Sequence, residues 1–126
     1  MHRQHLKNTQ AAISAWKTVP PEAVSNKLLK FRESPPYDEA PSCGSPACFG
    51  GHLPYFPHFA ALGVVINVKG APTMHIRGQP ALSFYAVSSR LFGNGTMFEP
   101  MTDEEGTPHQ VVMHRLITNL HKLQSA

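Results

Sequence analysis

The sequence predicts a mainly α fold: a small single-domain bundle of about five helices with one β-hairpin at about residues 64–77. With 126 residues, the chain has the length of one domain and can bury roughly two-thirds of its unfolded surface. Apolar residues make up 41% and charged residues 15% of the chain, a balance typical of an ordered globular protein. Apolar residues also recur every three or four positions in several segments, which is the period of an amphipathic helix.

Residues 1–32 are expected to form a basic helical N-terminal portion of this domain. Leu6, Ile13 and Trp16 recur at helical spacing, which predicts a first helix over residues 4–17 with these side chains turned to the core. Two consecutive prolines then end this helix and open a second one over residues 21–32.

A proline-rich loop and the start of a third helix come next. Residues 33–44 contain three prolines among acidic side chains, a composition that predicts a loop. The Ser45–Pro46 pair is a helix start, because the hydroxyl accepts a first-turn N–H and proline presets the backbone angle. Pro54 and Pro57 are expected to break or restart this helix, and Gly63 suits its C-terminal cap.

The last third of the chain carries the hairpin and two more helices. Two β-rich runs, Val64–Val68 and Thr73–Arg77, flank a short Lys-Gly-Ala-Pro segment and predict the hairpin. A Gln-Pro pair at position 79 is expected to open a fourth helix that ends at Gly93. After an acidic loop over residues 96–106, a Thr-Pro-His-Gln capping box opens the final helix, about 108–124. The motif-containing core of the domain is thus expected over residues 45–124.

The string CGSPACFGGH, residues 43–52, allows three interpretations. Cys43, Cys48 and His52 are potential zinc ligands, and zinc is the one cofactor that the sequence suggests, although no fourth ligand lies at a matching spacing. Alternatively, Cys48 in a first helical turn, with His52 one turn later, resembles an activated thiol nucleophile.

The third interpretation is structural, and the sequence favours it. Two adjacent glycines weaken a helix by about 1 kcal/mol each relative to alanine, so their presence indicates a close approach of another helix. A small buried cysteine fits beside such a contact. The structural motif then consists of Cys43, Gly44, Ser45, Cys48, Gly50 and Gly51.

The same string resembles the Cys-Gly-Thr-x-x-Cys-Ile-x-Gly-His/Trp signature of short, largely uncharacterised proteins encoded by phages and bacteria. The resemblance extends over about residues 43–124, through a leucine-glycine segment, a helix ending in Leu-Phe and a terminal helix. Ser45, Phe49 and the hairpin depart from the pattern. The resemblance implies a fold and a phage or bacterial source, and it implies no reaction.

Charge is distributed unevenly along the chain, whose net charge is +3. Acidic residues concentrate between positions 99 and 105, ahead of the last helix. Basic residues dominate the N-terminal portion, and they could contact the phosphates of a nucleic acid. The eight histidines are expected to be mostly solvated or packed, since ligand-type partners are missing at suitable spacing. The candidate nucleic-acid-binding residues are Arg3, Lys7, Lys17, Lys27, Lys30 and Arg32.

These features predict a non-enzymatic phage or bacterial accessory or regulatory protein that binds a macromolecular partner, with a host protein as the first candidate and a phage protein as a related one. Binding of nucleic acid is the alternative, and a zinc or thiol site is a further alternative. No cofactor is required by the leading interpretation. The longest nearly apolar run, Phe59–Val68, is about half of the length that spans a bilayer, so we expect a cytoplasmic protein of the bacterial host cell that makes no membrane contact. The sequence does not indicate an oligomeric state.

Overall fold

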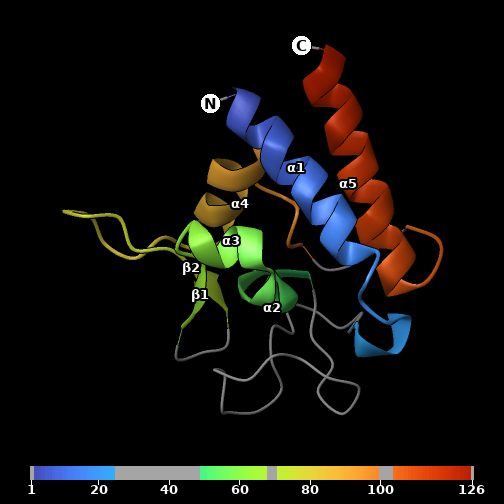
Figure 1. The fold of residues 1–126 in the computed structure, drawn as a ribbon, viewed down its shortest axis with the longest axis horizontal. Coiled ribbons are helices and arrows are strands. Elements are labelled where there is room, and N and C mark those ends of the chain that lie inside the picture. Colours follow the sequence, from blue (N-terminus) through green and yellow to red (C-terminus); the bar gives the residue numbers. More distant parts are fainter. Residues whose placement is uncertain (1, 25–48, 68–70, 100–103, 126) are drawn as a thin grey trace.

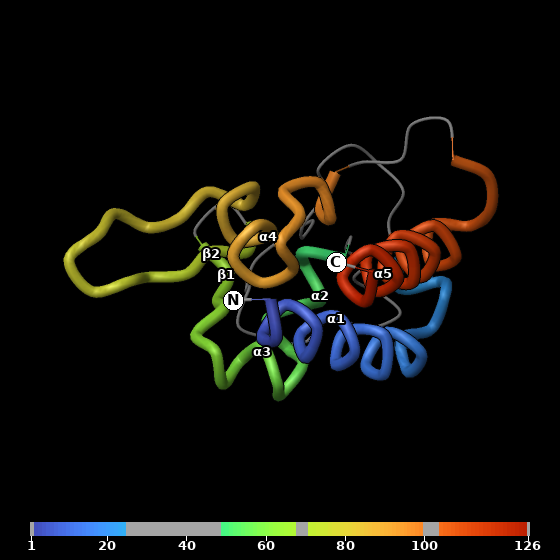
Figure 2. The backbone as a smooth tube through the Cα atoms, turned by 90° about the horizontal axis from the view of Figure 1, so that it is seen from above, coloured from blue at the N-terminus to red at the C-terminus, as the bar shows by residue number. Residues whose placement is uncertain are grey.

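The computed structural model describes residues 2–24, 49–67, 71–99 and 104–125 (Figure 1). It is mainly helical with one two-stranded antiparallel sheet, as the sequence predicts. The two long helices, α1 and α5, lie side by side and run in opposite directions, and α4 packs against α1 (Figures 1 and 2). The helices are α1 (His2–Trp16), α2 (Phe49–His52), α3 (Pro57–Ala61), α4 (Phe84–Phe92) and α5 (Pro108–Ser125), with 3-10 turns η1 (Pro21–Ala23) and η2 (Leu53–Tyr55) and strands β1 (Val65–Ile66) and β2 (Pro72–Thr73).

The buried face of α1 differs from the predicted one. Trp16 is fully buried, but Leu6 and Ile13 are only partly buried. The residues that share the inner face with Trp16 are Asn8, Thr9 and Ala12. Polar side chains can occupy this face because carbonyl groups of α4 and the amide of Asn119 bond to them, as described below.

The prediction of a helix over residues 21–32 is wrong for residues 21–24, which are the part that the structure describes. Only Pro21–Ala23 forms a 3-10 turn, and Val24 has an extended backbone. The carbonyl of Ala23 accepts a hydrogen bond from the imidazole of His52, and the Val24 side chain is buried in the core. These two contacts favour an extended chain over a further helical turn. Residues 25–32, and the loop predicted over 33–44, lie outside the described residues.

The motif region is helical where the structure describes it. The start predicted at Ser45 lies outside the described residues, whereas α2 contains both glycines of the motif, Gly50 and Gly51, and both are buried. The two later prolines act as predicted: Pro54 lies in η2, and Pro57 opens α3. Gly63 follows α3 with a φ of 90°, a left-handed conformation that glycine adopts without strain.

The hairpin is present but its strands are shorter than predicted. Val65 pairs with Thr73 and Ile66 with Pro72. Pairing does not continue toward Arg77, because the carbonyl of Met74 accepts a hydrogen bond from the amide of Leu82 instead. The hydroxyl of Thr73 also donates to the Leu82 carbonyl. The segment before α4 thus bonds to β2 and to the residue that follows β2.

This contact also corrects the predicted start of α4. The Gln79–Pro80 pair does not open the helix. Ser83 is the N-cap, and its hydroxyl accepts the amide of Ala86. The amide and carbonyl of Leu82 bond to Met74 and Thr73, so the helix begins only after it. The predicted end is confirmed, since Gly93 terminates α4 with a φ of 69°.

The last helix agrees with the prediction in position and in its capping. The Gln110 amide N–H donates to the Thr107 hydroxyl, and the Gln110 side chain accepts the Thr107 amide, which is a reciprocal capping box. Within the described ranges, no helix is long and apolar enough to cross a membrane.

Aromatic rings form the centre of the core. Trp16 makes an edge-to-face contact with Phe49, with ring centroids 5.3 Å apart. Phe49 in turn contacts Phe92 and Phe98, and Phe59 contacts Phe92. Each such pair contributes about 0.5–1.5 kcal/mol beyond the burial of its surface. The motif residue Phe49 is therefore a central core residue that joins α1, α4 and the acidic loop.

Candidate functional site

Two of the described basic residues of the N-terminal portion lie on the exposed face of α1, and the third, Lys17, directly follows this helix, where its amide still donates to the Ile13 carbonyl. Arg3, Lys7 and Lys17 are all exposed, and with Gln10 and Ser14 they follow a 4-3-4-3 spacing, which places them on one line along a helix. This line is opposite the buried face that contains Asn8, Thr9, Ala12 and Trp16. The other three basic candidates, Lys27, Lys30 and Arg32, lie outside the described residues.

Neither long helix contains a carboxylate. The sequences of α1 and α5 include arginine, lysine and histidine but no aspartate or glutamate. The solvent face of α1 is thus cationic without a neighbouring acidic side chain on its own helix. We call the exposed residues Arg3, Lys7, Gln10, Ser14 and Lys17 the basic face of α1.

The histidine of the cysteine motif holds two segments together. His52 is 4% exposed, and its Nε2–H donates to the carbonyl of Ala23 at 2.8 Å. Its ring also packs edge-on against Trp16. The described residues do not include four further residues of the motif: Cys43, Gly44, Ser45 and Cys48. Among the side chains that the structure describes, no three histidine, cysteine, aspartate or glutamate residues gather as a metal site, and the zinc and thiol hypotheses remain predictions.

A second histidine closes the contact between α1 and α5. The indole N–H of Trp16 donates to the carbonyl of His109 at 3.0 Å, and Nε2 of His109 donates to the carbonyl of Trp16 at 2.9 Å. The two rings stack with centroids 5.1 Å apart. This reciprocal pair fixes the end of α1 against the start of α5.

Polar side chains from other helices cap the C-terminal end of α4. The last carbonyls of a helix have no partner within the helix itself. Here the carbonyl of Leu91 accepts the side-chain amide of Asn8, and that of Phe92 accepts the side-chain amide of Asn119. The His5 ring lies against Gly93, directly after α4, and the Arg90 carbonyl is near enough to raise the pKa of this ring. We call His5, Asn8 and Asn119 the α4 cap; two members come from α1 and one from α5.

The α4 cap also bonds to α3, and Thr9 links two of its members to each other. The amide oxygen of Asn8 accepts bonds from Gln4 and from Nε2 of His58, both at 2.8 Å. Asn119 also donates to the Thr9 hydroxyl, which in turn donates to the carbonyl of His5. Four helices therefore meet in one polar network at this end of the bundle.

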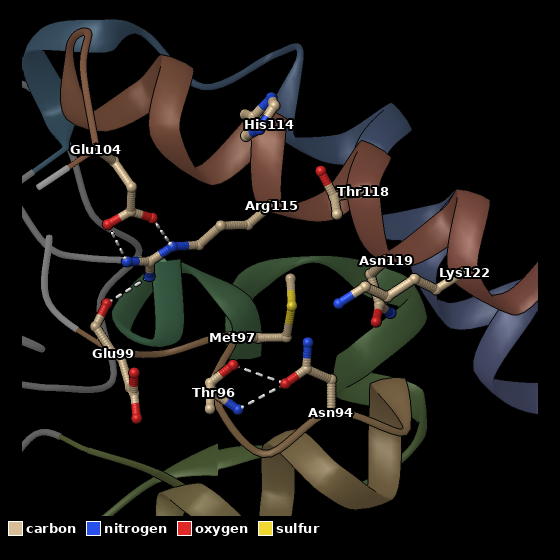
Figure 3. Close-up of a pocket in the computed structure, with 10 residues that line it drawn as sticks. All are labelled: Asn94, Thr96, Met97, Glu99, Glu104, His114, Arg115, Thr118, Asn119 and Lys122. Atoms are coloured by element: carbon tan, nitrogen blue, oxygen red, sulfur yellow. Dashed lines mark hydrogen bonds and ion pairs between the residues drawn. The ribbon is translucent and has the colours of Figure 1, made fainter. Parts of the chain in front are cut away.

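A shallow pocket of about 290 Å³ lies between α5 and the segment after α4 (Figure 3). Met97 lies beneath it, and Arg115 closes one side through a two-point ion pair with Glu104, at 2.6 and 2.9 Å, and a bond to the Glu99 carbonyl. Lys122 lies on the opposite side. Since Arg115 is committed to Glu104, the pocket has little net charge.

Sequence reasoning did not identify the α4 cap. A signal for it exists, because Asn8 lies one turn before Ala12 and two turns before Trp16, and Asn119 follows Val112 and Leu116 at a 4-3 spacing. Amides in register with a buried face need a partner. The signal predicts a buried polar contact, but not which carbonyls it satisfies.

Comparisons of the chain with protein-family models, with curated proteins and with solved structures found no match.

Proposed function

We propose that this protein is a non-enzymatic accessory or regulatory protein that acts by binding a macromolecular partner. The first candidate partner is a protein in the cytoplasm of a bacterial host cell. The basic face of α1 is the observation that supports binding: three cations lie along about 21 Å of helix, all exposed and opposite the core. Such a face complements an acidic protein surface, and charge complementarity of this kind guides association.

The use of the polar groups in the core agrees with a binding protein. His52, His109 and the α4 cap donate to main-chain carbonyls and so stabilise the fold. A phage or bacterial source for this protein follows from the resemblance of the cysteine motif, and it makes a host protein the natural first partner. The surface, and not a buried reaction centre, is then where this protein acts.

The test compares charge reversals on and off the basic face. Arg3→Glu lies on it, and Arg77→Glu, which replaces an exposed arginine in the loop after β2, makes the same change in net charge elsewhere. Tagged parent and variants are used to capture proteins from a bacterial lysate in increasing salt. We expect a specific protein that Arg77→Glu retains and Arg3→Glu loses. Capture of the same proteins by all three chains would contradict the proposal.

Nucleic acid is the second candidate partner, and the same face supports it. If three cations each neutralise one phosphate, the logarithmic salt slope for duplex DNA is about −2.7. Affinity then falls roughly 40-fold between about 50 and 200 mM salt. Contacts by all six basic candidates would double that slope. No retention of single- or double-stranded DNA or RNA at about 50 mM salt would eliminate this candidate.

A further inference from the structure

We propose that the first two turns of α1, residues 2–9, form an acid-sensitive latch on the C-terminal end of α4, which opens when His5 takes up a proton. The latch is a conformational device built from the α4 cap. It deepens the proposed function, because two of the three described cations of the basic face lie on it.

The first step of the argument is how residues 2–9 are attached. In this segment, Asn8 donates to the Leu91 carbonyl of α4, and the His5 ring lies against Gly93, near the Arg90 carbonyl. Asn8 is 1% exposed, so its amide has no access to water as a substitute partner. The attachment is thus made of buried hydrogen bonds and carries few apolar side chains, since Leu6 is only partly buried.

The second step is the position of the His5 ring. Its Nε2 atom has no accessible surface and no hydrogen-bond partner among the residues that the structure describes. In the neutral ring, this nitrogen can be the one that carries no hydrogen. The ring also lies directly on Gly93, where a Cβ atom would come within 2.7 Å of Nδ1.

The third step is what a proton does at this position. Neutral His5 fits, because one of its two nitrogens needs no hydrogen. Protonation adds a second N–H, on a nitrogen without an acceptor among the described residues, and a buried donor without a partner destabilises the folded state. Burial is the main reason why the pKa of His5 is lowered from its usual value of 6.5.

The surrounding charges act in both directions on His5. The Arg90 carbonyl raises the pKa by favouring the charged ring, whereas the amino terminus and His2 lower it further. From α3, His58 reaches the same network through Asn8. The exposed guanidinium of Arg90 on α4 adds no negative charge. Among the described residues, the groups that shift the pKa of His5 therefore include a carbonyl dipole that favours protonation and no carboxylate.

The opening stops at the middle of α1 because the second half of this helix is anchored separately. Ala12 and Trp16 are fully buried, and Trp16 exchanges hydrogen bonds with His109. Residues 2–9 can thus detach while the rest of α1 stays packed against α5. If the proposed function is correct, this movement displaces Arg3 and Lys7 from the line that they form with Lys17.

The test is hydrogen exchange of the purified full chain without any partner, at about pH 7.5 and about pH 5.5, corrected for the intrinsic pH dependence of exchange. We expect exchange at residues 6–9 to rise about threefold or more relative to residues 112–119 of α5. The variant His5→Gln, which keeps a neutral donor, should lose this pH effect, whereas His2→Gln should keep it. An equal rise in both helices, or a rise that persists in His5→Gln, would overturn the proposal.

A second measurement covers the case in which His5→Gln fails to fold. The ring protons of His5 in the parent chain are followed by NMR as the pH falls. We expect a midpoint below that of a free histidine, together with amide shifts of residues 6–9 that have the same midpoint. A His5 midpoint at or above the free value, or unmoved amides, would overturn the proposal. Because neither experiment needs a partner, their failure leaves the proposed binding function to its own test.

Discussion

Gly93 is the residue at which two demands on the backbone coincide. Its φ of 69° ends α4, and its missing side chain lets the His5 ring approach. Gly93→Ala should therefore lower the free energy of unfolding for two reasons. The left-handed backbone costs about 1–2 kcal/mol in alanine, and displacing the ring adds about 1 kcal/mol or more.

Gly78→Ala is the matched control for this prediction. Gly78 has a φ of 80°, but a Cβ atom there would meet nothing within 4 Å. It reports the backbone cost alone. Denaturant unfolding of both variants should show a larger loss for Gly93→Ala, and equal losses would mean that the His5 ring yields without cost.

Individual polar residues were the least predictable part of the molecule. The sequence indicates the helical period of α1, but it suggests Leu6 and Ile13 for the inner face, where the structure has Asn8 and Thr9. An apolar residue can stay partly exposed at little cost, whereas an amide is buried only if partners exist. Those partners, the last carbonyls of α4, come from a segment more than 80 positions away.

At the scale of elements, the helix boundaries that depend on signals within a few residues were predicted correctly. The capping box of α5 and the glycines after α3 and α4 act within a few residues, and all three appear as predicted. The start of α4 was wrong because Leu82 bonds to Met74, and the second helix was wrong because His52 bonds to Ala23. Tertiary contacts of this kind override local propensity.

The ion pair of Arg115 attaches the acidic loop to α5, and its removal is the prediction at this scale. The side chains are 17% and 29% exposed, so water screens the pair only in part. Arg115→Met keeps much of the apolar stem but leaves Glu104 and the Glu99 carbonyl without the guanidinium. We expect a loss of about 1–3 kcal/mol in unfolding free energy.

Lys122→Met is the control for Arg115→Met, because it also removes one positive charge from α5, at an exposed position near its end. Its effect on stability should stay within about 0.5 kcal/mol. Hydrogen exchange should rise at residues 96–99 and 104–106 in Arg115→Met only. Unchanged exchange there would mean that Met97 and Phe98, which are buried, hold the loop without the ion pair.

For the whole molecule, composition and periodicity were sufficient to predict a small, mainly α domain with one hairpin. They were not sufficient to place the functional surface. The basic face of α1 follows from the spacing of Arg3, Lys7 and Lys17 once the opposite face is known to be buried. The pairing of α1 with α5 does not follow from either helix alone, since the Trp16–His109 bonds join residues 93 positions apart.

The stability of the whole molecule should depend on pH through His5. Burial lowers the pKa of His5 below 6.5 in the folded chain, and the unfolded chain has the ordinary value. Between these two pKa values the unfolded chain binds more protons, so the free energy of unfolding rises with pH in that window. The contribution of neutral His5 is fully present above about pH 6.5 and is lost as the pH falls through the lowered folded pKa.

Denaturant unfolding at several pH values between about 5 and 8 measures this dependence. The slope of stability against pH in that window should be smaller in His5→Gln than in the parent. The exposed histidine His114 on α5 provides the control, since His114→Gln should leave the slope as it is in the parent. The opposite result would be a parent chain that becomes more stable on acidification, with this gain absent in His5→Gln. It would mean that the carbonyl groups at the end of α4 favour the protonated ring more strongly than burial disfavours it. In that case protonation would tighten the contact between α1 and α4, and acid would strengthen the bundle at the point where we expect it to open.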